Sequence, residues 1–445
     1  MTSNAIVPFA PAPSAASARG LASVLLRGGT VVDQHGTRRA DVLVRDGRII
    51  AVAADVDDPR ATVIECDGSI IAPGLVDLHT HLREPGKEEA ETIETGSRAA
   101  AMGGYTSVVA MPNTTPPIDS VDVVRSVIDL ARFALCRVVI SGAITVGRKG
   151  EQLAPMGEMA ALGVRMFTDD GTGVQDNRLM RRAMEYAGPL GVILSQHCED
   201  AALAGDGAMH EGAWSSKLGI PGQPAEAEEL MVMRDLALAR LTGTPVHFQH
   251  LSTAGSVAMV RAAKAGGMRI TCEATPHHFT LTHAACASYD AVFKVNPPLR
   301  TEEDVAAIID GLVDGTIDCI ATDHAPHTPD SKELPFDQAP PGMLGLETAL
   351  ALAITQLGSR VDMAHLLGLV SWRPAAIMGL PAAGVVEGAP ADLVVFDPTE
   401  RWTVDRTALH SRAVNTPFHG MEVTGRVRHT ICAGELVVTD AVPQR

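Results

Sequence analysis

The sequence predicts an α/β fold: a TIM-type (β/α)8 barrel together with a small β-sandwich domain formed by both termini. Short apolar runs alternate with stretches of helical character through the middle of the chain, whereas β-like segments recur at both ends. Polar side chains follow the ends of the apolar runs. With 445 residues, 46% of them hydrophobic, the chain has enough apolar material for a large core.

The two ends of the chain carry the pattern of short antiparallel strands. Near the N-terminus, apolar segments are separated by turn dipeptides such as His35-Gly36 and Asp46-Gly47, and similar segments return after Asp392. We therefore predict one small β domain from residues 21–70 and 388–440. The barrel is expected over residues 71–387, and residues 1–20 are expected to form a disordered tail.

The middle of the chain contains eight apolar runs that alternate with helical stretches. Eight βα units match a closed barrel better than an open doubly wound sheet, which usually has fewer strands and often a glycine-rich phosphate turn. No G-x-G-x-x-G or Walker sequence occurs. The predicted barrel strands are residues 74–78, 106–111, 137–143, 164–168, 192–196, 245–249, 269–274 and 317–321.

Acidic residues outnumber basic ones, with 53 Asp and Glu against 36 Lys and Arg and a formal net charge of −17. Such a chain repels nucleic acids and anionic membranes. Nine Phe, three Trp and three Tyr also leave few rings on which bases could stack. We therefore expect neither a nucleic acid nor a membrane as a partner.

The cysteines and the first residues of the chain bear on the cellular compartment of the protein. Seven cysteines, an odd number without C-x-x-C spacing, argue against a disulfide framework or a thiolate zinc site. Residues 1–18 are uncharged, but they lack the positive start of a signal peptide and contain three prolines. We expect a cytoplasmic protein.

Histidines and carboxylates gather where the predicted strands end. His79 and His81 are two residues apart, so on an extended strand both imidazoles point to the same side. His197, His250 and Asp323 stand at the corresponding ends of other strands, where the active-site face of a barrel lies. Imidazole and carboxylate together are ligands that suit zinc, so we expect a metal site here.

For two neighbouring aspartates the strand pattern leaves open which one points into the metal site, and three further histidines are expected outside it. Of Asp169 and Asp170 only one can point inward, since neighbours on a strand alternate. His324 is expected to point away from the metals. His277 and His278 are expected to be core histidines rather than ligands.

The motifs in these regions carry a family resemblance over nearly the whole chain. The segment PGLVDLHTHLREPG at 73–86 resembles the cyclic amidohydrolases. Four further segments narrow the resemblance to the dihydroorotases, and PGMLGLET at 341–348 is similar too. The four are MPNT at 111–114, ATPHH at 274–278, VNPPLR at 295–300 and ATDHAPH at 321–327.

The resemblance implies a set of metal ligands. Many relatives bridge two metals with a carboxylated lysine on the fourth strand, but this strand has Arg165 and no lysine. In this respect the chain is similar to the class I bacterial dihydroorotases, in which an aspartate at the position of Asp170 takes the bridging role. The resemblance implies two Zn²⁺ ions per subunit. One would be held by His79, His81, Asp170 and Asp323, and the other by Asp170, His197 and His250.

The resemblance also implies the substrate contacts and the reaction. Arg83 would hold a substrate carboxylate, and Asp323 would move the proton between water and the leaving nitrogen. The implied reaction is the reversible cyclisation of N-carbamoyl-L-aspartate to (S)-dihydroorotate and water in pyrimidine (UMP) biosynthesis. The implied substrate contacts are His81, Leu82, Arg83, Asn113, Asn296, His327, Pro341 and Gly342.

Other functions and assemblies remain open at this point. An allantoinase or a dihydropyrimidinase would share the barrel and the His-x-His pair, but those relatives usually carry the lysine that is missing here. A non-catalytic scaffold subunit of aspartate transcarbamoylase would have lost metal ligands that this chain keeps. A homodimer, or a complex of the active chain with aspartate transcarbamoylase, is open as well.

Overall fold

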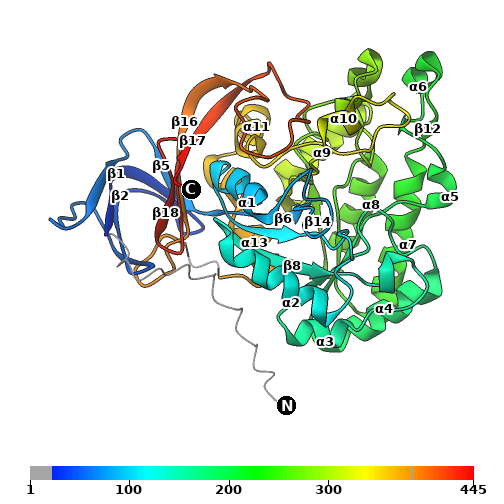
Figure 1. Ribbon diagram of the computed structural model, residues 1–445, viewed down its shortest axis with the longest axis horizontal. Helices are drawn as coiled ribbons and strands as arrows, with labels where there is room; N and C mark the ends of the chain where they lie inside the picture. Colours follow the sequence, from blue (N-terminus) through cyan, green and yellow to red (C-terminus); the bar gives the residue numbers. More distant parts are fainter. Residues whose placement is uncertain (1–22, 382–383) are drawn as a thin grey trace.

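The computed structural model describes residues 23–381 and 384–445 and shows two β-containing parts side by side (Figure 1). One part is a barrel surrounded by helices, and the other is a sheet that contains segments from both ends of the chain. The predicted tail at residues 1–20 lies outside the described residues. Among the described residues, no helix is long and apolar enough to cross a membrane.

The barrel has eight parallel strands, as the sequence predicts. They pair in the order β15-β14-β13-β10-β9-β8-β7-β6, and a parallel bridge from Thr80 to His324 links the two ends of the sheet. This nearly closed arrangement confirms the predicted barrel. Its strands are β6 (Leu75–Thr80), β7 (Tyr105–Ala110), β8 (Arg137–Gly142), β9 (Met166–Phe167), β10 (Ile193–Gln196), β13 (Val246–Phe248), β14 (Ile270–Ala274) and β15 (Cys319–Ile320).

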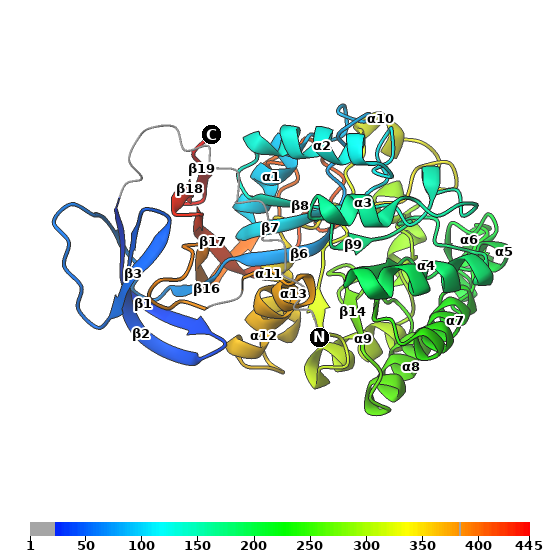
Figure 2. The same cartoon turned by 90° about the horizontal axis from the view of Figure 1, so that it is seen from below.

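Helices connect the barrel strands and cover the outside of the sheet (Figure 2). Local signals set their ends: Thr92 and Thr95 form a capping box at the start of α1, and Gly191 ends α4 in a left-handed conformation. The longer helices are α1 (Ile93–Met102), α2 (Val121–Leu130), α4 (Asn177–Leu190), α7 (Glu226–Thr242), α8 (Ala254–Ala265), α9 (Glu302–Asp314), α11 (Ala349–Leu357) and α12 (Met363–Val370). Shorter ones are α3 (Met156–Ala161), α5 (Ala201–Ala204), α6 (Ala213–Leu218), α10 (Pro329–Lys332) and α13 (Trp372–Met378).

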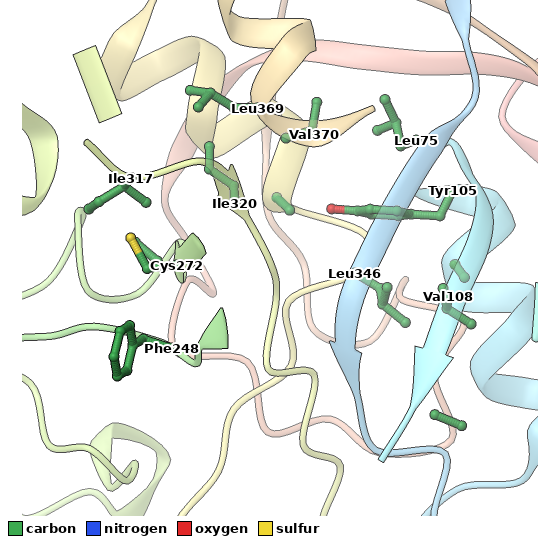
Figure 3. Packing of buried hydrophobic residues seen from close by; sticks show 14 of the residues in the cluster. Leu75, Tyr105, Val108, Phe248, Cys272, Ile317, Ile320, Leu346, Leu369 and Val370 are labelled. Carbon is green, nitrogen blue, oxygen red and sulfur yellow. The ribbon is translucent and has the colours of Figure 1, made fainter. Parts of the chain in front are cut away.

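The main core lies between the barrel strands and the helices (Figure 3). Side chains such as Leu75, Phe248 and Ile320 are fully buried in it. Alternate residues of the same strands, such as Val76 and Val109, belong to a separate buried cluster. This alternation follows from the period of two along a strand, and it gives the barrel an apolar layer on each face.

The sheet made from both ends of the chain confirms the predicted terminal β domain. The two halves meet where β5 pairs antiparallel with β16, and all nine strands belong to one continuous mixed sheet rather than to two separate sheets. Its strands are β1 (Val24–Asp33), β2 (Gly36–Arg45), β3 (Arg48–Ala53), β4 (Thr62–Glu65), β5 (Ile70–Pro73), β16 (Leu393–Thr403), β17 (Glu422–Cys432), β18 (Glu435–Thr439) and β19 (Val442–Pro443). The domain limits at 21–70, 71–387 and 388–440 stay a prediction.

Candidate active site

The His-x-His pair lies at the carboxyl end of β6. His79 is the last residue but one of this fully buried strand, and His81 directly follows its last residue, Thr80; the two ring centroids are 5.3 Å apart. The main-chain N–H of His81 donates to the carbonyl oxygen of His324 at 2.9 Å, which joins the ends of the first and last strands. Both imidazoles are buried, as expected for residues inside the mouth of a barrel.

Of the two aspartates that follow β9, Asp170 points toward the histidines. Its Oδ1 lies 3.2 Å from Nε2 of His79, and its Oδ2 lies 3.6 Å from Nε2 of His81. Asp169 points the other way and accepts hydrogen bonds from the main-chain N–H groups of Ile144 and Thr145. The alternation along the strand therefore brings only one of the two carboxylates into the site.

His197 and His250, from the ends of β10 and β13, form a second group with Asp170. Nδ1 of His197 lies 2.9 Å from Nε2 of His250 and 3.8 Å from Oδ1 of Asp170. The ligand atoms of His79, His81 and Asp170 lie within 4.8 Å of one another, and so do those of Asp170, His197 and His250. Asp170 thus belongs to both groups.

Asp323 completes the cluster from the end of the last strand. Its Oδ1 lies 2.9 Å from Nε2 of His81 and 3.4 Å from Nε2 of His79. Arg83, His250 and Asp323 have backbone φ angles of 61°, 29° and 47°. Positive φ is strained for residues other than glycine and is concentrated at functional sites, so these three positions are typical of a site that the surrounding fold holds in place.

The cluster fits a divalent metal. Nε2 of His79, which faces the carboxylates of Asp170 and Asp323, is buried and has no hydrogen-bond partner among the residues that the structure describes. Burial, together with the neighbouring His197 and His79, lowers the pKa of His250 to about 3, so its imidazole is neutral and can bind a cation. Burial by itself would raise the pKa of Asp170, but the nearby imidazoles, His79 above all, hold it well below its usual range.

One carboxylate that supports the cluster was missed by the sequence analysis. Oε1 of Glu273 lies 2.8 Å from Nδ1 of His79, and its Oε2 lies 3.0 Å from Nε2 of His247. A carboxylate behind a ligating imidazole fixes the tautomer and orientation of the ring. The available signal was a glutamate in the otherwise buried strand β14, where an unpaired charge would be costly.

A cavity of about 150 Å³ opens beside the cluster. Leu82 is a predicted substrate residue that does not line it, because its side chain is buried in the main core. The other predicted substrate residues do: His81, Arg83, Asn113, Asn296, His327, Pro341 and Gly342.

Two of these cavity residues are anchored by the protein itself. Nε of Arg83 donates to the carbonyl oxygen of Pro326 at 3.1 Å, and Nη2 of Arg83 lies 3.4 Å from Nε2 of His327. Asn113 links two members of the first ligand group, since its Oδ1 lies 2.9 Å from Nδ1 of His81 and its Nδ2 donates to Asp170 at 3.2 Å. Part of the capacity of Asn113 for hydrogen bonds is therefore used to orient metal-ligand candidates.

The remaining histidines lie where the sequence analysis expected them. His324 points away from the cluster, with its Nε2 3.5 Å from Oε2 of Glu91. His278 bonds to Oγ1 of Thr275 and to the carbonyl oxygen of Pro297. His277 is buried, and its Nε2 has no hydrogen-bond partner within residues 23–381 and 384–445.

The barrel and the overlapping groups of histidines and carboxylates at its strand ends define a hydrolase of the amidohydrolase class. Residues 68–256 match the family model described as Dihydro-orotase-like, and residues 317–438 match that of the Amidohydrolase family. A dihydroorotase of Pelotomaculum thermopropionicum is 48% identical over 94% of this chain and 99% of its own length. One of a Geobacter species is 46% identical over 93% and 99%. The chain belongs to the dihydroorotase family.

Two solved structures share the fold. An L-hydantoinase of Arthrobacter aurescens aligns with a TM-score of 0.85 and 24% identity, over 94% of this chain and 96% of that one. A dihydropyrimidinase of Brevibacillus agri aligns with a TM-score of 0.84 and 23% identity, over 95% and 96%. At this level of identity the comparison establishes the architecture, both the barrel and the terminal β domain.

Proposed function

We propose that this chain is a zinc-dependent dihydroorotase that interconverts N-carbamoyl-L-aspartate and (S)-dihydroorotate plus water in cytoplasmic pyrimidine (UMP) biosynthesis. The observation that carries the proposal is the cavity in which two overlapping ligand groups and the guanidinium of Arg83 converge. The high identity to relatives named dihydroorotase supports it. The retained ligand set also speaks against a scaffold role without catalysis.

The metal ligands follow from the two groups. His79, His81 and Asp323 would hold one Zn²⁺, His197 and His250 would hold the other, and Asp170 would serve both. Imidazoles and carboxylates together are a donor set that suits zinc. When bound, such ions lower the pKa of water toward about 7 and polarise the carbonyl that is attacked.

The chain's own side chains orient the substrate. Both dihydroorotate and N-carbamoyl-L-aspartate carry a free carboxylate, and the buried Arg83 offers a guanidinium to it in the cavity. Burial lowers the pKa of Arg83 only to about 10, so the group keeps its charge at neutral pH. His81, Asn113 and Asn296 contact the substrate from the cavity wall, as do His327, Pro341 and Gly342. We propose a contact from Leu82 through its main chain only.

Asp323 moves the proton. In the hydrolytic direction its carboxylate takes a proton from the attacking water and returns it to the ring nitrogen as the amide C–N bond breaks. In the biosynthetic direction the same carboxylate takes the proton from that nitrogen as the bond forms. The contact of Asp323 Oδ1 with His81 Nε2 keeps the carboxylate at the cavity, close to both ligand groups.

Removing the charge behind His79 is expected to weaken metal binding. Glu273→Gln leaves the shape of the side chain but replaces the carboxylate that orients Nδ1 of His79. The affinity for zinc should fall about 10- to 100-fold, measured by competition with a chromophoric chelator. Glu347→Gln is the matched control, because that partly buried carboxylate bonds to His410 and does not contact the ligand groups. Equal zinc affinity in the two variants would contradict the role of Glu273.

The function is tested by assaying the purified, zinc-supplemented protein alone with L-dihydroorotate and following the ring absorbance, with dihydrouracil and allantoin as competing substrates. We expect turnover of dihydroorotate and bound zinc by elemental analysis. Turnover of only dihydrouracil or allantoin would replace the proposal with another cyclic amidase. A protein with zinc but no turnover, active only after addition of aspartate transcarbamoylase, would make the complex the functional unit.

The assembly is proposed separately from the chemistry. A homodimer, or a complex with aspartate transcarbamoylase, is distinguished by measuring the molar mass of the chain in solution with and without that enzyme. A mass of two chains for the protein alone supports the homodimer, and a larger species formed only in the mixture supports the complex.

A further inference from the structure

A carboxylate that the proposed mechanism does not use lies behind the cavity. Oε2 of Glu199 accepts a hydrogen bond from Nδ2 of Asn296 at 2.6 Å and another from Nε2 of Gln223 at 2.8 Å. The same oxygen lies 3.7 Å from Nε2 of His197. Glu199 therefore connects a cavity residue with the outer side of a metal-ligand candidate.

The contact with Glu199 determines which way the Asn296 side chain faces. An ionised carboxylate only accepts hydrogen bonds, so the group that Asn296 turns toward it must be the NH₂. The carboxamide oxygen Oδ1 is then on the other side of the planar group. Asn296 lines the cavity, and its Oδ1 makes no hydrogen bond within the described part of the chain. Asn296 thus offers the cavity an acceptor, not a donor.

Buried groups hold Glu199 from behind. Gln223, in the short strand β12 (Gly222–Gln223), is almost fully buried. Its main-chain carbonyl oxygen accepts a hydrogen bond from Nη1 of Arg300 at 3.1 Å. Nε of the fully buried Arg300 donates to Oγ of Ser252 at 3.1 Å. Because each of these partners is fixed by the interior, the Asn296 carboxamide is not free to flip when a ligand enters.

We propose that Glu199 is a positioning residue that locks the Asn296 carboxamide with its oxygen toward the substrate, where it accepts a ring N–H of the cyclic ureide. The inference rests on the proposed function, since dihydroorotate carries such N–H groups on both sides of its urea carbonyl. The two cavity residues then have different hydrogen-bond roles. The guanidinium of Arg83 donates to the substrate carboxylate, and the carboxamide oxygen of Asn296 accepts from a ring N–H. A ligand that has an acceptor atom in place of this ring N–H would set its lone pair against that of Asn296 Oδ1. The site should therefore bind such a ligand much more weakly.

The first test separates substrate positioning from metal binding. Glu199→Leu removes the acceptor and frees the carboxamide, so KM for dihydroorotate should rise about tenfold while kcat and zinc content change less than about threefold. Glu199→Gln keeps one carbonyl oxygen for Asn296 and should stay within about threefold of the wild-type KM. Asp200→Asn is the matched control, because that neighbouring side chain caps α5 and does not line the cavity.

A charge-conserving exchange provides the second test. In Asn296→Asp two carboxylates face each other, and kcat/KM should fall about 100-fold. In the double variant Glu199→Gln with Asn296→Asp, the new amide donates to the new carboxylate, whose other oxygen still faces the cavity. We expect the double variant to recover at least about tenfold over Asn296→Asp, a coupling that independent structural damage would not produce.

The outcomes distinguish this inference from the function on which it rests. A wild-type protein that does not turn over dihydroorotate overturns the proposed function. Turnover by the wild type combined with an unchanged KM in Glu199→Leu overturns the positioning role alone. Loss of zinc and kcat in Glu199→Leu at an unchanged KM also overturns it, since Glu199 would then act through His197.

Discussion

The Asp170→Ala variant is expected to lose metal from both positions and to lose at least about a thousandfold in kcat, because one carboxylate serves both ligand groups. No other side chain of the cluster lies in both groups, so no other single replacement should remove both metals. The measurement is zinc content by elemental analysis, together with turnover of dihydroorotate at saturating zinc.

The neighbouring carboxylate provides the control for this result. Asp169 accepts hydrogen bonds from Ile144 and Thr145 and points away from the histidines, so Asp169→Asn should lower thermal stability but retain zinc. Full zinc content and activity in Asp170→Ala would show that the two groups do not hold the metals that we propose. Loss of zinc in Asp169→Asn but not in Asp170→Ala would reverse the assignment.

Replacing Asp323 by asparagine is expected to give the second largest effect. Asparagine keeps the shape of the side chain and one oxygen near His81, but it cannot take a proton at neutral pH. The value of kcat should fall about 10²- to 10⁴-fold, the usual contribution of a general acid–base group, while most of the zinc stays bound. Single-turnover assays with zinc-loaded protein check this directly, because they separate the chemical step from product release.

His324 is the matched control for Asp323. Although adjacent in sequence, its ring contacts Glu91 rather than the cluster, so His324→Asn should affect stability more than kcat. If Asp323→Asn retained wild-type kcat with full zinc, the proton would have to be carried by another group, and the proposed role of Asp323 would be wrong.

The fold was predictable because its signals are local or periodic. Short apolar runs that alternate with helical stretches are sufficient to indicate eight βα units. The pattern of short strands at both ends of the chain predicts a domain formed by both termini, and the pairing of β5 with β16 confirms it. The strand-end rule for barrels then predicts that His79, His81, His197, His250 and Asp323 lie at one mouth of the barrel.

Which side chains face one another depends on the packing of the chain in three dimensions. The sequence left Asp169 and Asp170 as alternatives by position, and the orientation of the chain after β9 selects Asp170. The side chain of Leu82 stands between two cavity residues in the sequence, yet it packs into the core, since neighbours along an extended chain alternate in direction.

The contacts of the two supporting carboxylates, Glu273 and Glu199, also depend on packing between distant segments. Composition and periodicity place Glu273 on a strand and Glu199 after one, but hydrogen bonds over 2.6 to 2.8 Å depend on how strands far apart in the sequence register across the barrel. Local sequence patterns are therefore enough to predict the barrel and the set of residue types at its mouth. The packing of the strands decided the partners of each imidazole and amide, because short-range directional contacts depend on positions that no local pattern encodes.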